Sequence, residues 1–190
     1  MGRSLTLVLG GARSGKSDYA LSLVGRGHEK VLFVATATAS DEEMQTRIAA
    51  HRARRPAQWE TLEVHLQVGQ AISAATPTDW ILLECMTLLV SNIMVGNSDH
   101  PIESDFRRTL DAELESLLDA YSKSQAKWVI VSNEVGLGLV PPYPLGRFFR
   151  DELGHINQVL AQKADVVLLM VAGVAMVVKG QPAEDGTNGD

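Results

Sequence analysis

Residues 10–17 form the strongest chemical pattern in the chain, because they read GGARSGKS and match the spacing G-x-x-x-x-G-K-S. Glycines at these positions let backbone N–H groups wrap around a chain of phosphates, and the N-terminus of a following helix adds partial positive charge. The ammonium of Lys16 can then reach the β- and γ-phosphates, and the hydroxyl of Ser17 can ligate Mg²⁺. The pattern predicts a nucleoside triphosphate site rather than a glycine-rich turn with an incidental lysine.

A second group of reactive side chains surrounds His51, since arginines stand at positions 47, 52, 54 and 55. Two interpretations are open. His51 can be a hydrogen-bonded core residue, with the arginines complementing the C-terminus of a helix. Alternatively, its imidazole attacks a phosphorus atom while the arginines hold the phosphate oxygens. Histidine suits that second role because an ordinary imidazole is largely neutral, and therefore nucleophilic, near pH 7.

The element that must position His51 is a helix running from Asp41 towards Arg54. Ser40 and Glu43 have the spacing of a capping box at its start, and Pro56 ends it. Residues 44, 48, 51 and 55 recur at helical spacing and share one face of this helix. The apolar members of that face predict that His51 points inward rather than into solvent.

Short apolar runs alternate with helical patterns along the rest of the chain. We expect strands over 5–9, 31–35, 80–84, 128–132, 165–171 and 175–179. We expect helices over 18–24, 106–121 and 145–160. Most of the strands are continuously apolar, which indicates a parallel sheet covered on both faces. The fold class is therefore α/β: a single P-loop (RecA-like), doubly wound domain over residues 1–179 with a mostly parallel sheet. The polar residues 180–190 read as a disordered tail.

Composition narrows the possible partners. The chain has 190 residues, 17 basic and 23 acidic side chains and a formal net charge of −6, which argues against a nucleic-acid partner. The apolar run 166–178 is shorter than the ~20 residues of a membrane span, so no membrane insertion is expected. The single cysteine, Cys85, fits a reducing compartment, and we expect a cytoplasmic protein.

Two carboxylates follow apolar strands. Glu84 can be a partner of Mg²⁺ through water, an acceptor for the nucleoside, or a solvated strand end. Glu134 can be a general base for phosphoryl transfer or a structural hydrogen-bond acceptor.

Taken together, these residues resemble the bifunctional adenosylcobinamide kinase/adenosylcobinamide-phosphate guanylyltransferase family of cobalamin biosynthesis. The resemblance covers nearly all of residues 5–179. Its most specific part is the pattern H-x-x-x-R-P-x-x-W-x-T-x-E from His51 to Glu63, joined to N-E-V-G-x-G from Asn133. Residues 10–17, 35–37, 82–87 and 147–151 also match.

The resemblance implies two reactions at one site. ATP or GTP phosphorylates adenosylcobinamide, with Mg²⁺ as cofactor and Lys16 as a catalytic residue. His51 then carries a guanylyl group from GTP to the corrinoid phosphate, giving adenosylcobinamide-GDP. Ser17 is the implied Mg²⁺ ligand, and the family implies a homo-oligomer, a trimer. The implied nucleotide-binding residues are Gly10, Gly11, Ala12, Arg13, Ser14, Gly15, Lys16, Ser17, Ala35, Thr36, Ala37, Arg52, Ala53, Arg54, Arg55, Glu63 and Glu84.

Two rival functions remain at this stage. A simple P-loop kinase for another small hydroxyl substrate would need Lys16 but would give His51 no covalent role. A RecA-like, nucleotide-dependent binding module would hydrolyse nucleotide slowly and present a partner surface.

Overall fold

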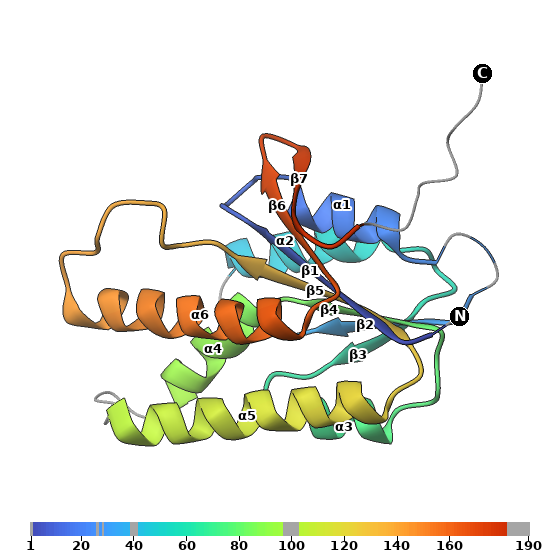
Figure 1. Ribbon diagram of the computed structural model, residues 1–190, viewed down its shortest axis with the longest axis horizontal. Coiled ribbons are helices and arrows are strands. Elements are labelled where there is room, and N and C mark those ends of the chain that lie inside the picture. The colour runs from blue at the N-terminus through green and yellow to red at the C-terminus, as the bar shows by residue number, and fades with distance from the viewer. Residues whose placement is uncertain (1, 26, 28, 39–41, 97–102, 182–190) are drawn as a thin grey trace.

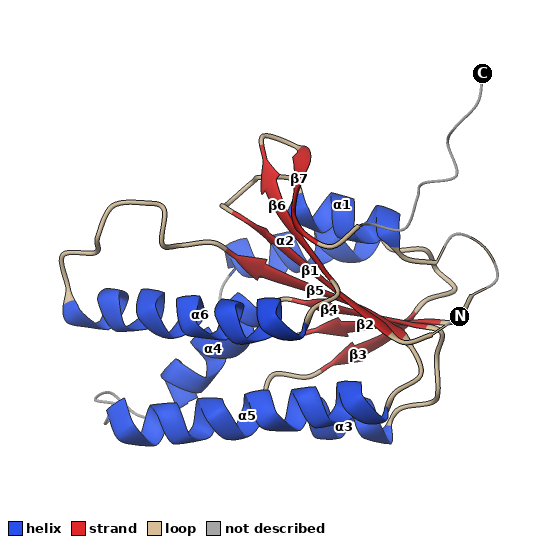
Figure 2. Cartoon of the chain, in the orientation of Figure 1, coloured by secondary structure: helices blue, strands red, loops and turns tan. Residues whose placement is uncertain are grey.

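The structure is a computed structural model that describes residues 2–25, 27, 29–38, 42–96 and 103–181. It is a seven-stranded sheet between two layers of helices (Figures 1 and 2). The strand order across the sheet is β3-β2-β4-β5-β1-β6-β7. All neighbours are parallel except β6 and β7. The strands are β1 Ser4–Gly10, β2 Val31–Ala35, β3 Glu60–Glu63, β4 Trp80–Glu84, β5 Lys127–Asn133, β6 Val166–Val171 and β7 Val174–Lys179.

The helices divide unequally between the two faces of the sheet (Figure 1). On one face lie α1 (Lys16–Leu23) and α2 (Glu42–Ala53). The other face is covered by α3 (Val68–Ala74), α4 (Met86–Gly96), α5 (Glu103–Lys123) and α6 (Pro144–Lys163). Because both faces are covered, alternate residues of one strand enter different cores. In β2, for example, Leu32 packs towards the four-helix face and Phe33 towards the α1 face.

The sequence-based expectations for the sheet hold in most respects. The fold class is confirmed, and all six expected strands are present. The seventh, β3, was not predicted because three of its four residues, ETLE, are polar and exposed and only Leu62 is partly buried. Helices α5 and α6 are confirmed, and the apolar side of α5 is core, since Phe106, Leu110 and Leu117 are buried.

Two helices were not predicted. The seven-residue α3 is too short for a clear periodicity. Helix α4 is apolar almost throughout and begins two residues after β4 ends, so no polar face marks it. Ser40 and Asp41, at the predicted capping box, lie outside the described residues, as does most of the predicted tail. Among the described helices, none has the length and apolarity needed to cross a bilayer.

The register of the sheet brings the candidate residues to one edge. Ala35 pairs with Glu63 on one side and with Glu84 on the other, while Gly10 pairs with Asn133. All of these residues lie at the carboxyl ends of parallel strands. In open α/β sheets, ligands bind at that edge.

Candidate nucleotide-binding and catalytic site

The phosphate loop joins β1 to α1 and has a backbone that glycine makes possible. Gly15 stands before the first turn of α1 with φ of 90°, a left-handed conformation that glycine adopts without strain. A Cβ at Gly10 would lie 2.9 Å from the backbone oxygen of Met170. The loop is further held by the β6–β7 turn, because the N–H of Gly173 donates to the carbonyl of Ser14 at 2.9 Å. The loop is therefore fixed before any nucleotide binds.

Lys16 lies over this loop. Its Nζ donates to the carbonyl of Gly11 at 3.0 Å. Burial lowers the pKa of the Lys16 ammonium, against the raising effects of nearby Cys85 and Glu84. A partly desolvated cation at the start of α1 is suited to binding the phosphate oxygens of a nucleotide.

Glu84, at the end of β4, links the loop to α2. One of its oxygens, Oε1, accepts a hydrogen bond from the hydroxyl of Ser17. The same Oε1 lies 3.8 Å from Nδ1 of His51. The side chain of His51 is 39% exposed, against 13% for Glu84. His51 is thus not an enclosed core residue; it stands at the cavity wall beside a fixed carboxylate.

The arginines at the end of α2 are held in different ways. Arg54 donates to Asp18 of α1 at 2.8 Å, and Arg52 pairs with Glu63 of β3. The guanidinium carbon of Arg55 lies 3.5 Å from the ring centroid of Phe33. These contacts fix the end of α2 against both α1 and β3.

Arg55 differs from its neighbours because part of its guanidinium lacks a partner. Its Nε and Nη1 are buried and have no hydrogen-bond partner within the described part of the chain. Burial lowers the pKa of Arg55, while Glu84 raises it. Buried donors without partners are rare in folded proteins, so these two nitrogens are suited to an anionic ligand.

These residues surround a cavity of about 950 Å³. Ile48, His51 and Arg55 line it together, as their predicted shared face requires; the side chains of Met44 and Arg47 lie outside what the structure describes. The predicted site residues that line this cavity are Ala12, Arg13, Ser14, Gly15, Lys16, Ser17, Ala35, Ala37, His51, Arg52, Arg54, Arg55, Glu63 and Glu84.

Four predicted nucleotide-binding residues do not line the cavity: Gly10, Gly11, Thr36 and Ala53. Thr36 is fully buried, and its hydroxyl accepts the N–H of Cys85 and donates to the Cys85 carbonyl, both at 2.8 Å. It ties β2 to β4 and acts on the site through the backbone. Gly10 acts through the close packing described above.

Sequence reasoning missed other residues of the wall. Phe33 lies inside a continuously apolar strand, where nothing distinguishes a cavity residue from a core residue. His65 follows the unpredicted β3. Asn133 could have been found, because a polar residue at the carboxyl end of a buried strand faces the ligand edge.

The donor set also fits Mg²⁺. Ser17 and Glu84 bring a hydroxyl and a carboxylate into contact at the cavity wall. Among the described residues there is no group of three or more His, Cys, Asp or Glu side chains able to hold a metal ion. Mg²⁺ bound with nucleotide usually has one or two protein ligands and takes the rest from phosphates and water, so this small set is sufficient.

Comparison with known proteins assigns the chain to a family. Residues 6–178 match the family model described as CobU, cobinamide kinase/cobinamide phosphate guanyltransferase. The chain belongs to this family. The bifunctional adenosylcobalamin biosynthesis protein CobU of Salmonella typhimurium is 42% identical over 181 residues, 92% of this chain and 99% of its own.

Other CobU family members are similarly close. CobU of Escherichia coli is 41% identical over 92% of this chain and 99% of its own. The bifunctional protein CobP of Pseudomonas aeruginosa is 42% identical over 93% of this chain and 98% of its own. Among solved structures, the RadB recombinase aligns with 88% of this chain and 74% of its own, at 15% identity and a TM-score of 0.47.

Proposed function

We propose that this CobU family member carries out two successive reactions at the cavity. It phosphorylates adenosylcobinamide with ATP or GTP. It then transfers GMP from GTP, through a guanylyl group on His51, to adenosylcobinamide phosphate. Membership of the family supports both activities. The observation that carries the proposal is the position of His51, which meets Glu84 at the wall of the cavity that the phosphate loop also lines.

In the first reaction the acceptor hydroxyl attacks the γ-phosphorus of the nucleotide, and the bond to the β-phosphate oxygen breaks. Lys16 and the N–H groups of the phosphate loop hold the transferring phosphoryl group and oppose its charge. Glu134 is a candidate for accepting the hydroxyl proton, since it directly follows Asn133 of the cavity wall; one of its carboxylate oxygens also accepts the N–H of Gly136, which is a structural role. Catalysis in this step is mainly positioning and electrostatics.

Ser17 and Glu84 are the residues that would hold Mg²⁺, directly or through water. The ion supplies neutralisation of the phosphate oxygens when it is bound with nucleotide. The contribution of the chain itself is the fixed hydroxyl–carboxylate pair that receives it.

In the second reaction Nε2 of His51 attacks the α-phosphorus of GTP, and the bond to the pyrophosphate oxygen breaks. A phosphate oxygen of adenosylcobinamide phosphate then attacks the same phosphorus. The P–N bond breaks, which regenerates His51 and releases adenosylcobinamide-GDP. Covalent catalysis divides one displacement between two phosphates into two easier steps. The buried, unpartnered nitrogens of Arg55 support a role for its guanidinium in holding phosphate oxygens during both steps.

We also propose a cytoplasmic homotrimer. Its support is the family resemblance and the single cysteine. Strand β7 adds a second argument, because Val174, Val177 and Val178 are each more than half exposed at the sheet edge. Apolar side chains on an edge strand are suited to contact with another copy of the chain.

Two labels test the proposed function in a single assay. With adenosylcobinamide and GTP labelled at the γ-phosphate, we expect label in the corrinoid monophosphate. With GTP labelled at the α-phosphate, we expect label in the corrinoid dinucleotide product. Transfer of label from the γ-phosphate alone would show that the protein is a kinase without guanylyl transfer. No transfer of label from either phosphate would contradict both proposed reactions.

A further inference from the structure

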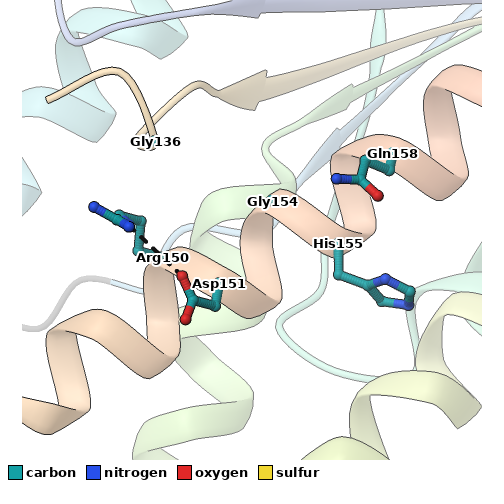
Figure 3. Close-up of a pocket in the computed structure, with 6 residues that line it drawn as sticks. All are labelled: Gly136, Arg150, Asp151, Gly154, His155 and Gln158. Atoms are coloured by element: carbon teal, nitrogen blue, oxygen red, sulfur yellow. Dashed lines mark ion pairs between the residues drawn. The ribbon is translucent and has the colours of Figure 1, made fainter. Parts of the chain in front are cut away.

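A second cavity, of about 340 Å³, lies between α6 and the loop that follows β5. We call it the α6 cleft. Figure 3 shows Gly136 on the loop and, along α6, Arg150, Asp151, Gly154, His155 and Gln158. None of these six residues lines the nucleotide cavity.

The α6 cleft is close to the phosphate loop. Asn133 lines the nucleotide cavity and Gly136 lines the cleft. Three residues of extended chain span at most about 11 Å, so the two walls are no further apart than that. The connection is also fixed, since the carboxylate of Glu134 accepts the N–H of Gly136 at 2.5 Å while the Glu134 N–H donates to Gly10.

The polar groups of the cleft are mixed in sign and type. Arg150 offers hydrogen-bond donors and Asp151 offers acceptors; the two form an ion pair, with Nε of Arg150 3.6 Å from Oδ1 of Asp151 (Figure 3). His155 and Gln158 can each donate and accept. A set whose charges balance is poorly suited to an isolated anion or cation. It is well suited to neutral carboxamides, which need a donor and an acceptor side by side.

The loop beside the cleft is apolar and is held in place. Leu137 is 83% exposed and Leu139 is 97% exposed. The guanidinium of Arg147 donates to the carbonyls of Pro141 and Pro142, at 3.1 and 2.9 Å. Large exposed apolar side chains on a loop fixed in this way indicate a binding surface.

Helix α6 is itself rigidly placed. The amide of Asn157 donates to the carbonyl of Asn133 at 3.0 Å. On the neighbouring turn, Glu152 accepts from Arg107 of α5 at 2.7 Å. The cleft is therefore a preformed feature whose position relative to the nucleotide cavity is set by hydrogen bonds.

We propose that the α6 cleft binds carboxamide side chains of the corrinoid acceptor. The inference rests on the proposed function and names the residues that hold its second substrate. A corrinoid is an apolar macrocycle fringed with carboxamides, which matches an apolar loop beside a mixed polar cleft. Its aminopropanol arm, together with the propionamide that joins it to the ring, is seven bonds long and spans about 8 Å at the ~1.2 Å per bond of an extended chain. With the carboxamides in the cleft, the arm extends towards the nucleotide cavity at Asn133.

Three variants test this inference: Arg150→Ala, Gln158→Ala and the double variant that combines them. Each single variant is expected to raise the KM for adenosylcobinamide phosphate about tenfold, as expected for a lost hydrogen bond to a bound ligand. Titration calorimetry with adenosylcobinamide should show the same weakening without any catalysis. The labelling of His51 by GTP alone needs no corrinoid, and it should proceed at the wild-type rate. Gln162→Ala, on the same helix but outside the cleft, is the matched control and should bind adenosylcobinamide normally.

The outcomes separate this inference from the proposed function. Unchanged corrinoid affinity in the double variant would contradict corrinoid binding at the α6 cleft, even if the wild-type protein transfers GMP. If the wild-type protein transfers no GMP but binds the corrinoid, and the double variant does not bind it, corrinoid binding at the α6 cleft is supported and the proposed function is contradicted. A corrinoid that keeps its carboxamide side chains but lacks the aminopropanol arm should also bind the wild-type protein. Its affinity for the double variant should be lower by about tenfold or more. Equal affinity of both proteins for this compound would contradict carboxamide recognition.

Discussion

His51 and Glu84 face each other at the wall of the nucleotide cavity, with Nδ1 of the imidazole 3.8 Å from Oε1 of the carboxylate. Such contacts are often long in unliganded enzymes and shorten in the complex. A carboxylate that accepts the Nδ1 proton leaves Nε2 unprotonated and turned away from it. Because Ser17 also donates to Oε1, the carboxylate beside His51 is itself fixed by the phosphate loop.

Glu84→Gln should slow the guanylylation of His51. The neutral amide can donate where the carboxylate accepted, which favours the wrong tautomer, and it cannot stabilise positive charge on the ring. Carboxylates that orient metal-bound histidines contribute about 10–100-fold, and we expect a loss of similar size in the labelling rate with GTP. Glu60→Gln, an exposed carboxylate on β3, serves as the control. A wild-type labelling rate in Glu84→Gln would show that Glu84 does not orient His51.

Lys16→Met should impair both reactions, because both place charged phosphate oxygens over the same loop. Removing one preorganised electrostatic contact typically lowers the rate by about 10²–10³-fold. The measurement is the initial rate of transfer from γ-labelled and from α-labelled GTP. Lys163→Met, at the exposed end of α6, is the comparison variant. Loss of one reaction with the other intact would mean that the two reactions do not share the loop.

Arg55→Lys should weaken GTP binding even though the positive charge is kept. The planar guanidinium stacks on Phe33 and presents two buried donors, whereas an ammonium can do neither in the same geometry. We expect a dissociation constant about tenfold higher, measured by calorimetry with a non-hydrolysable GTP analogue. Arg108→Lys, an exposed residue of α5, should bind normally. Unchanged affinity in Arg55→Lys would show that the stacked guanidinium does not hold the nucleotide.

A stability prediction concerns Glu113, a buried carboxylate of α5. It accepts the N–H groups of Gln67 and Val68 at 2.8 and 2.6 Å, at the start of α3. Glu113→Ala leaves those donors without a partner, which should lower the free energy of unfolding by about 2 kcal/mol. Urea denaturation measures this loss. Glu115→Ala, exposed two residues further on, should unfold like the wild-type protein; equal loss in both variants would rule out the explanation.

Much of this molecule could be predicted from sequence because its signals are local. The strand–loop–helix order around residues 10–17 and the continuously apolar strands are sufficient for the fold class. The residues that were missed depend on long-range pairing. Strand β3 is recognisable only from its pairing with β2, and the position of Phe33 at the cavity, under the guanidinium of Arg55, follows from the packing of α2 on the sheet. Glu84 had several possible roles in the sequence, and the contacts with Ser17 and His51 appear only when β4 meets α1 and α2.

The central claim is that His51 carries the guanylyl group, and labelling of the protein itself tests this most directly. Wild-type protein is incubated with GTP labelled at the α-phosphate and then denatured. We expect one equivalent of label per chain, labile in acid and stable in alkali as a phosphoramidate is, and no label on His51→Ala. Absence of label on the wild-type protein, or label that persists on His51→Ala, would contradict the account.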